Sequence, residues 1–198
     1  GHETLSIEGD SVVETGSGRR VRYADVAVNA LYNDRQEQLQ TQASAISHRS
    51  PPPFSAHFAR VAVDVDTGRV RVVQYIAAVD CGTAINPVLA EGQTEGGVMN
   101  AISSALWEQY DFNEKGRMRN PSFTTYKIGM MRDLPDIRTI LVPTYEETGP
   151  YGAKSVSEIC TNGPLPVLSN AIFDAVGVRL RAAPFTAEAV WRAMHSGK

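Results

Sequence analysis

The sequence has little cysteine and no long apolar run. Its 198 residues include two cysteines, Cys81 and Cys160, too few for a disulfide scaffold, a four-thiolate zinc site or an iron–sulfur cluster. We interpret them as reduced, buried thiols, which favours a cytoplasmic location. No run approaches the roughly 20 apolar residues of a transmembrane helix, and residues 1–10 lack the features of a signal peptide. Because the chain begins at Gly1, without an initiator methionine, we expect it to be a piece of a longer protein.

The sequence also lacks an excess of charge of one sign. There are 19 Lys and Arg against 22 Asp and Glu, a formal net charge of -3, and the basic residues are not clustered. Nucleic-acid binding needs a basic patch that neutralises phosphates. We therefore expect no nucleic-acid partner and no membrane segment.

The first quarter of the chain differs in composition from the rest. Residues 35–50 are polar and lead into three prolines at 51–53, which impose an extended path and end any preceding helix. We predict an N-terminal segment with a proline-rich linker over residues 1–53, and a domain over residues 54–198. Within the N-terminal segment, turn residues separate two predicted strands, at 5–8 and 11–13, and a helix follows at 23–31.

Strands and helices follow one another in irregular order in the second part, which is typical of an α+β fold. Valine-rich strands at 57–65 and 69–79 flank the turn Asp66-Thr67-Gly68. Asn86 and Pro87 predict the start of a helix that reaches about residue 108. We predict these further elements: a strand at 137–142, a helix at 164–176 ended by Gly177, a strand at 178–182, and a helix from Thr186 to about 194.

The long helix contains three glycines, at 92, 96 and 97. Each costs about 1 kcal/mol relative to alanine inside a helix, so we expect another group to approach the backbone there. Gln93, Gly96, Gly97 and Asn100 share one face. An amide beside bare backbone suits recognition of a flat, polar heterocycle, although close packing of the helix on another element explains the same pattern.

A second candidate is the Gly- and Ser-rich stretch at 149–158, which ends in a single carboxylate, Glu158. The backbone N–H groups of such a loop can hold an anion. Apolar neighbours, Val156 and Ile159, predict that Glu158 is largely desolvated, and desolvation raises the pKa of a carboxyl group toward the range of a general base. The alternative is an ordinary acidic side chain in the first turn of a helix.

Other patterns favour structural roles. Residues 64–68 (Asp-Val-Asp-Thr-Gly) begin like a calcium loop but lack its later ligands, which indicates a surface hairpin. The four histidines, at 2, 48, 57 and 195, have no metal-ligand spacing, and we expect His57 to be structural. The sequence has no glycine-flanked serine elbow, dinucleotide fingerprint or Walker loop.

Gly-Ala-Lys-Ser-Val-Ser-Glu at 152–158 is the clearest of several ordered blocks in this sequence. Together these blocks resemble the C-terminal end of the molybdenum-binding subunit of the xanthine dehydrogenase/aldehyde oxidase family. The likeness covers about residue 57 to the end, and residues 1–50 match more weakly. The other blocks, in order, lie at 79–82, 85–87, 92–97, 120–126, 133–135, 162–166, 170–180 and 185–188.

The resemblance implies the C-terminal, molybdopterin-binding domain of an enzyme that hydroxylates an aldehyde or an aromatic N-heterocycle with oxygen from water. The family's general base falls on Glu158, and the glutamine that hydrogen-bonds the pterin falls on Gln93. Lys154, Ser155 and Val156 fall on the loop under the molybdenum ligands. The cofactor would be molybdopterin, or its cytosine dinucleotide, carrying molybdenum without direct metal ligands from this chain. Iron–sulfur clusters, and FAD, would lie on other chains or domains.

Departures from the family pattern leave alternatives open. Ser155 and Ser157 stand where many members have glycine, and the family's earlier cofactor loops are absent, so we expect the chain to be inactive alone and to need the remainder of the subunit and an iron–sulfur subunit. One alternative is a non-catalytic binding or assembly module, with Glu158 in solvent and no cleft beside Gln93. Another is a cofactorless hydrolase with Glu158 as base, for which we find no partner nucleophile.

Overall fold

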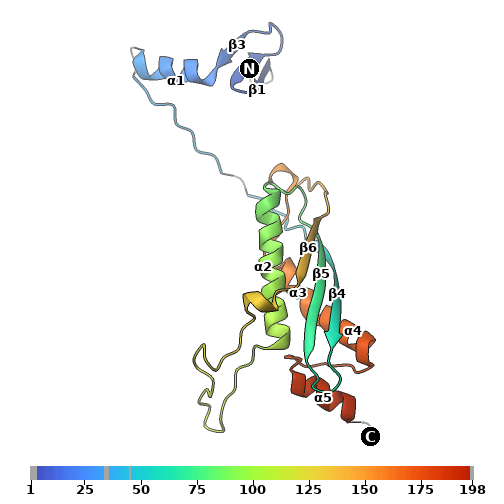
Figure 1. Cartoon of the computed structure of the whole chain (residues 1–198). Helices are drawn as coiled ribbons and strands as arrows, with labels where there is room; N and C mark the ends of the chain where they lie inside the picture. The colour runs from blue at the N-terminus through green and yellow to red at the C-terminus, as the bar shows by residue number, and fades with distance from the viewer. Residues whose placement is uncertain (1–3, 34–35, 45, 197–198) are drawn as a thin grey trace. The chain divides into compact units, whose positions relative to one another are not determined.

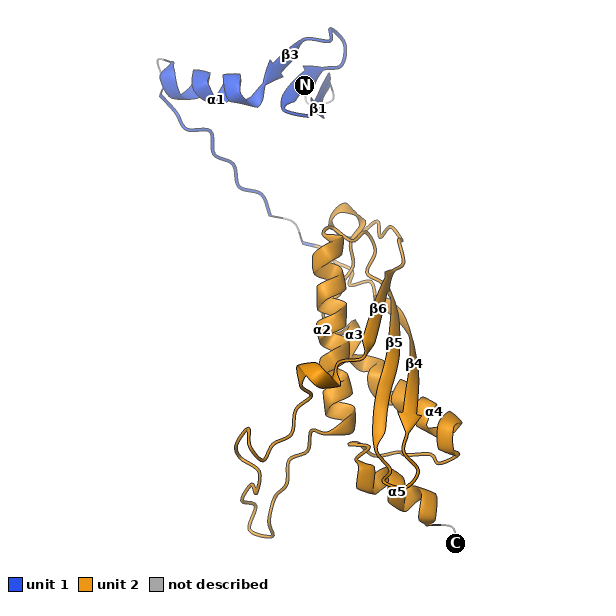
Figure 2. Cartoon of the chain, in the orientation of Figure 1, with its two compact units in different colours: residues 1–46 blue, residues 47–198 orange. Residues whose placement is uncertain are grey.

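The computed structural model describes residues 4–33, 36–44 and 46–196. The chain divides into two compact units, residues 1–46 and residues 47–198 (Figure 2). The functional division predicted at residue 53 stays a prediction. Among the described helices, none is both long enough and apolar enough to cross a bilayer.

The first unit is a three-stranded antiparallel sheet followed by one helix. Strands β1 (Leu5–Glu8), β2 (Ser11–Glu14) and β3 (Arg20–Arg22) pair in that order, and α1 (Tyr23–Tyr32) begins directly after β3. The predicted first two strands and the helix are confirmed. The third strand was not predicted, because its three residues include two arginines and so show no run of apolar or β-branched residues. No residue of α1 is buried.

The second unit is organised by a mixed sheet with the order β4-β5-β6 (Figure 1). Strands β4 (Phe54–Val63) and β5 (Val70–Asp80) form an antiparallel hairpin, and β6 (Asp136–Leu141) pairs with β5 in parallel. The carboxylate of Asp64 accepts hydrogen bonds from the amides of Asp66 (3.0 Å) and Thr67 (3.2 Å), which fixes the turn. This confirms the predicted hairpin.

Helix α2 (Pro87–Leu106) makes the crossover that a parallel pair of strands requires. The side-chain oxygen of Asn86 accepts a hydrogen bond from the Leu89 amide (3.1 Å), so the predicted cap is confirmed. Val88, in the first turn, is 75% exposed. The residues that the helix buries are Ala90, Thr94, Val98, Ala101, Ile102, Ser103, Ala105 and Leu106.

The three glycines of α2 have different surroundings. A Cβ atom on Gly97 would lie 2.9 Å from the Cβ of Cys160, so another helix does approach the backbone there, as predicted. Cβ atoms on Gly92 and Gly96 would meet no atom within 4 Å among the described residues. The helix therefore keeps a bare, exposed strip of backbone beside Gln93.

The C-terminal part consists of short helices. They are η2 (Met131–Asp133), η3 (Pro150–Gly152), α3 (Ile159–Asn162), α4 (Pro164–Val176) and α5 (Ala187–His195). Gly177 ends α4 in a left-handed conformation with φ 73°, and the Thr186 hydroxyl accepts from the Ala189 amide (3.1 Å), which confirms both predicted caps. The strand predicted at 178–182 is wrong. The backbone of this segment bonds to α4 instead of to a strand: the Leu180 carbonyl accepts a hydrogen bond from the Ser169 hydroxyl (2.7 Å).

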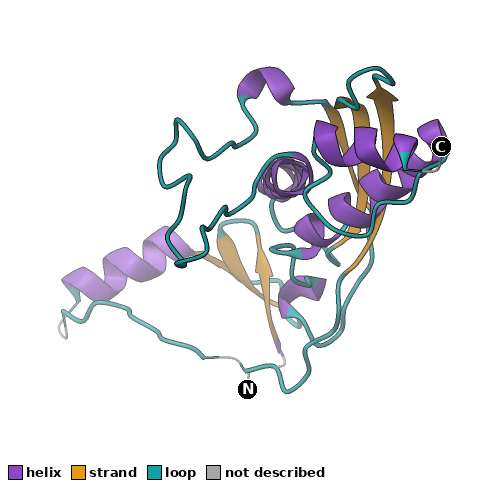
Figure 3. Ribbon diagram, turned by 90° about the horizontal axis from the view of Figure 1, so that it is seen from below, coloured by secondary structure: helices purple, strands orange, loops and turns teal. Residues whose placement is uncertain are grey.

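The core lies between one face of the sheet and the helices beside it, as the view along α2 shows (Figure 3). Tyr75, Ala77 and Val79 alternate along β5 and are fully buried. They belong to one cluster with Val98 and Ile102 of α2 and with residues of α4. The predicted α+β class is confirmed.

Helix α4 offers a matched test of this packing. Leu168 is fully buried, whereas Leu165 on the same helix is 43% exposed. Leu168→Ala is expected to lower the free energy of unfolding by about 2–5 kcal/mol, because it removes apolar contacts and leaves a cavity. Leu165→Ala is expected to cost under about 1 kcal/mol. Urea unfolding at unchanged m-value measures both, and equal losses would contradict the assigned core.

Candidate functional site

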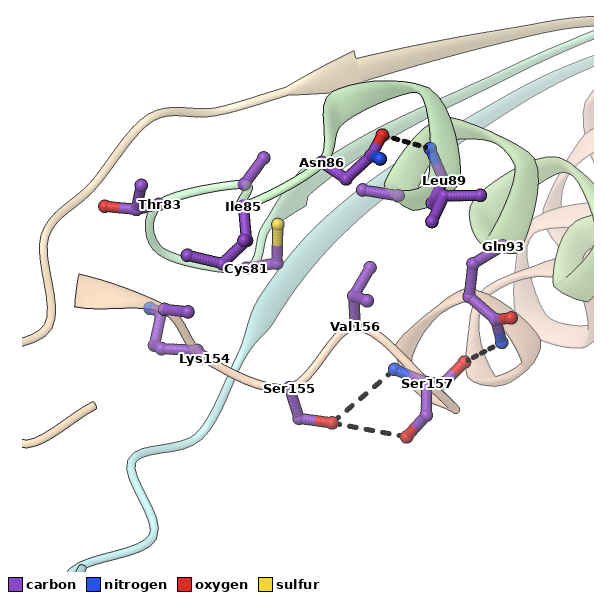
Figure 4. Close-up of a pocket in the computed structure, with 13 residues that line it drawn as sticks. Cys81, Thr83, Ile85, Asn86, Leu89, Gln93, Lys154, Ser155, Val156 and Ser157 are labelled. Carbon is purple, nitrogen blue, oxygen red and sulfur yellow. Dashed lines mark hydrogen bonds between the residues drawn. The ribbon is translucent and has the colours of Figure 1, made fainter. Parts of the chain in front are cut away.

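The candidate site is a cleft of about 470 Å³ at the N-terminal end of α2 (Figure 4). Three segments line it: residues 81–86 after β5, the first two turns of α2, and residues 153–157. Gln93, Lys154, Ser155 and Val156 all contribute to the lining. The structure therefore brings together four of the five predicted site residues.

The 153–157 loop is fixed to the end of β5 by backbone hydrogen bonds. The amide of Lys154 donates to the Cys81 carbonyl (2.7 Å), and the amide of Thr83 donates to the Gly152 carbonyl (2.8 Å). Gly82 lies between them with φ 69°, and a Cβ atom there would lie 2.3 Å from the Gly152 oxygen. Only glycine suits that position, since both its conformation and its surroundings exclude a side chain.

A largely buried ion pair makes the same connection through side chains. The ammonium of Lys154 lies 2.6 Å from the carboxylate of Asp80, and these side chains are only 8% and 17% exposed. Asp80 also accepts hydrogen bonds from the Thr144 hydroxyl (2.6 Å) and the Gly82 amide (3.0 Å).

This environment determines the protonation of Asp80. Burial alone would raise its pKa, but the hydrogen bonds from Lys154, Thr144 and the Gly82 amide outweigh burial and lower the pKa below its usual value. The charge of Lys154 is thereby neutralised within the protein. Its side chain acts as an anchor for the loop rather than as a free cation in the cleft.

Gln93 connects the loop to α2 at the other side of the cleft. Its side-chain nitrogen donates to the Ser157 carbonyl (3.1 Å), as Figure 4 shows. Its side-chain oxygen accepts no hydrogen bond from any residue that the structure describes, and the side chain is exposed. Gln93 therefore retains an acceptor at the cleft.

The loop itself carries free donors. Within the described part of the chain, the backbone amides of Ser155 and Val156 donate to no other group. The hydroxyls of Ser155 and Ser157 lie 3.2 Å apart. Consecutive unpaired amides beside hydroxyl groups are suited to an anionic or strongly polar ligand.

Glu158 lies next to the cleft but does not line it. The side chain is exposed, and its carboxylate accepts a hydrogen bond from the Ser157 hydroxyl (2.7 Å). The predicted desolvation is therefore wrong in this chain. Glu158 occupies the cap position of α3, a four-residue helix whose buried member is Cys160 on another side, so the apolar neighbours in sequence do not surround the carboxylate.

Sequence reasoning did not assign the wall formed by residues 81–86 to the site. The available signal was Asp80, an acidic residue ending an apolar strand and followed closely by a glycine. The two cysteines are free and buried, and burial raises the pKa of each thiol, which confirms the interpretation of buried thiols. Among the described residues there is no group of three or more His, Cys, Asp or Glu side chains arranged to hold a metal ion.

Comparisons with known proteins identify the family of this chain. A family described as the molybdopterin cofactor-binding domain matches residues 1–135. The probable hypoxanthine oxidase XdhD of Escherichia coli K12 is 36% identical over 183 residues, which cover 92% of this chain and 19% of that protein. The carbon monoxide dehydrogenase large chain of Afipia carboxidovorans OM5 is 34% identical over 150 residues, covering 74% and 18%.

Solved structures show the same fold. Quinoline 2-oxidoreductase from Pseudomonas putida 86 superposes with a TM-score of 0.82 at 26% identity, covering 97% of this chain and 26% of that one. The Cu,Mo-CO dehydrogenase superposes with a TM-score of 0.80 at 28% identity, covering 98% and 25%. This chain thus spans about a fifth to a quarter of the length of these relatives.

The fold and the cleft define a domain of the molybdenum hydroxylase class. The chain belongs to the molybdopterin cofactor-binding domains of the xanthine dehydrogenase/aldehyde oxidase family. Its residues fit that cofactor, because the cleft offers two unpaired amides and a free amide oxygen to a polar heterocycle with an anionic group.

The Asp80–Lys154 pair generates a prediction about pH. Because the folded-state pKa of Asp80 is lowered, the pair stabilises the protein above about pH 4 and loses this effect as pH falls through the folded-state pKa. Asp80→Asn is expected to destabilise the chain by about 1–3 kcal/mol at pH 7, since it leaves the largely buried ammonium of Lys154 without its charged partner.

Urea unfolding of both proteins between pH 7 and pH 3 measures this difference. The gap between the natural protein and Asp80→Asn should shrink below about pH 4. The double variant with Lys154→Met is the control, and it should recover part of the lost stability because no unpaired charge remains. A gap that stays constant with pH would contradict the assigned ionisation of Asp80.

Proposed function

We propose that this chain is the C-terminal domain of a molybdenum hydroxylase subunit. The complete enzyme would hydroxylate an N-heterocycle or an aldehyde with oxygen derived from water. In this proposal, Glu158 acts as general base, and Gln93, Lys154, Ser155 and Val156 form the part of the cofactor site that this chain provides. The isolated chain is inactive, because it holds only one side of the site.

One observation carries the proposal: a cleft whose two walls are joined by the hydrogen bond from Gln93 to the Ser157 carbonyl (3.1 Å). That bond places the amide of α2 directly beside the loop with free N–H groups. The sequence resemblance assigned these two elements to one cofactor site. They lie 64 positions apart in the chain, so their meeting in one cleft is independent support.

The chain's own residues have distinct parts in this chemistry. When bound, the molybdenum cofactor supplies the centre that takes up the electrons of the oxidation. The amides of Ser155 and Val156 and the side-chain oxygen of Gln93 bind and orient the cofactor. Lys154, tied to Asp80, holds the loop in place. Glu158 takes up a proton at its carboxylate oxygen, and the Ser157 hydroxyl orients that carboxylate (2.7 Å).

The remaining parts of the proposal concern partners. The rest of the molybdenum subunit would cover Glu158 and complete the substrate site, and iron–sulfur clusters, with FAD, on other chains or domains would carry electrons away. Molybdopterin or its cytosine dinucleotide is the cofactor in this assembly. Buried, protonated thiols at Cys81 and Cys160 support a reducing, cytoplasmic location.

A second candidate function follows from the exposure of Glu158. A non-catalytic binding or assembly module of the same fold would have its carboxylate in solvent, as this chain does. The same candidate leaves the cleft beside Gln93 without a role, which is why we favour the enzyme. Substitution of Glu158 in the complete assembly separates the two.

Glu158→Gln in the complete, cofactor-loaded enzyme is expected to leave the molybdenum content unchanged. Turnover should fall about 10²- to 10⁴-fold, because an amide cannot accept the proton. Metal analysis and steady-state kinetics measure the two quantities. Glu114→Gln, an exposed carboxylate in the loop after α2, is the control and should behave as the natural enzyme. Full activity of Glu158→Gln would favour the non-catalytic module.

Gln93→Ala tests cofactor binding separately from the reaction. Loss of one hydrogen bond to the cofactor, together with the bond to Ser157 that holds the loop, is expected to weaken cofactor retention about 5- to 30-fold. Pterin and molybdenum contents after dialysis measure retention. Gln109→Ala, an exposed amide beyond the end of α2, is the control. Equal retention in both variants would remove Gln93 from the cofactor site.

A further inference from the structure

A histidine outside the cleft lies directly beneath the helix that Glu158 caps. His57 of β4 is half-buried, and its Nδ1 lies 3.0 Å from the hydroxyl of Tyr75 on β5. Its Nε2 lies 2.9 Å from the Ser55 hydroxyl. The rings of His57 and Tyr75 meet edge to face, with centroids 5.8 Å apart. Both ring nitrogens therefore have partners, and the orientation of the imidazole is fixed.

The fixed ring meets the backbone where α3 ends and α4 begins. A Cβ atom on Gly163, the residue between the two helices, would lie 2.3 Å from carbon atoms of the His57 ring. Burial lowers the pKa of His57, and the nearby Ile159 backbone opposes the shift only in part. The neutral imidazole of His57, held in a fixed orientation, therefore packs against the end of α3.

The opposite side of α3 is held by α2. Cys160 packs on Gly97, because a Cβ atom added to Gly97 would lie 2.9 Å from the Cβ of Cys160. The side chain of Gln93 donates a hydrogen bond to the Ser157 carbonyl. Residues 157–163 are therefore clamped between α2 and the His57–Tyr75 pair. Since α3 contains only four residues, it has little internal stability, and its position depends on these contacts.

We propose that His57 is a positioning residue, which fixes the orientation of α3 and thereby the direction of the Glu158 carboxylate. The inference rests on the proposed function for the role of Glu158, but not for the position of α3. Tyr75 supports it, because its buried hydroxyl fixes the ring through Nδ1. A histidine that merely fills space would need neither partner.

The contact between His57 and Gly163 is tested by a pair of substitutions in the full chain. Gly163 has helical φ and ψ (-75° and -43°), so alanine is suited to its backbone and Gly163→Ala can be costly only through the clash with the ring. We expect it to lower the urea midpoint, and we expect the loss to be largely absent in the His57→Ala background. Equal losses in the two backgrounds would overturn the contact.

Amide hydrogen exchange of the full chain tests the position of α3 without any cofactor. His57→Phe keeps a ring but removes both hydrogen bonds, and Tyr75→Phe removes only the partner hydroxyl. Each is expected to speed exchange in residues 157–163 by about tenfold while the β5 amides keep their protection. Phe58→Leu, an exposed neighbour on β4, is the control. Unchanged exchange in both variants would overturn the proposal.

Kinetics of the complete enzyme then test whether the position matters to Glu158. His57→Phe is expected to lower kcat about 10- to 100-fold with KM and molybdenum content nearly unchanged. Added to Glu158→Gln, it should lower kcat no further, since it acts through that carboxylate. Additive losses would overturn this role. If Glu158→Gln alone is fully active, the proposed function fails, and the exchange result still decides the positioning of α3.

Discussion

The Asp80–Lys154 ion pair is the interaction on which the geometry of the cleft depends. It joins the last residue of β5 to the loop that forms one wall of the cleft. Around it, backbone hydrogen bonds between residues 81–83 and 152–154 complete the connection. The loop is irregular and belongs to no strand, so it lacks a regular series of backbone hydrogen bonds. The largely buried charge pair, with its fixed hydrogen-bond partners, gives the loop a defined conformation.

Helix α2 forms the opposite wall of the cleft, and its two faces have different surroundings. The face that carries Val98 and Ile102 packs into the core. The other face remains bare at Gly92 and Gly96, beside Gln93. In the proposed function this bareness has a role, since a planar cofactor can approach backbone that carries no side chains. The same helix holds α3 through Gly97, so one element organises the cofactor wall and the segment with the proposed base.

Most helix ends and turns were predictable, because they are determined by residues close together in the sequence. The Asn86 cap, the Asp64–Gly68 turn and the Gly177 stop were read correctly, since each acts through hydrogen bonds or backbone conformation within a few residues. The resemblance also located four of the residues that line the cleft: Gln93, Lys154, Ser155 and Val156. The burial of Glu158 and the strand at 178–182 were predicted wrongly, because both depend on which distant segments pack nearby. The residues of the Asp80–Lys154 pair are 74 positions apart, and no periodic pattern in the sequence indicates that they meet.

The parallel pairing of β5 with β6 has a consequence for biosynthesis. The hairpin of β4 and β5 can form as soon as residue 80 has left the ribosome, but β6 must wait for the whole crossover, and the loop wall arrives later still. Contacts of such long sequence separation form late in folding. An unfinished chain that stops before residue 154 lacks the second wall of the cleft. A ligand that needs both walls can therefore bind only after this region has been translated.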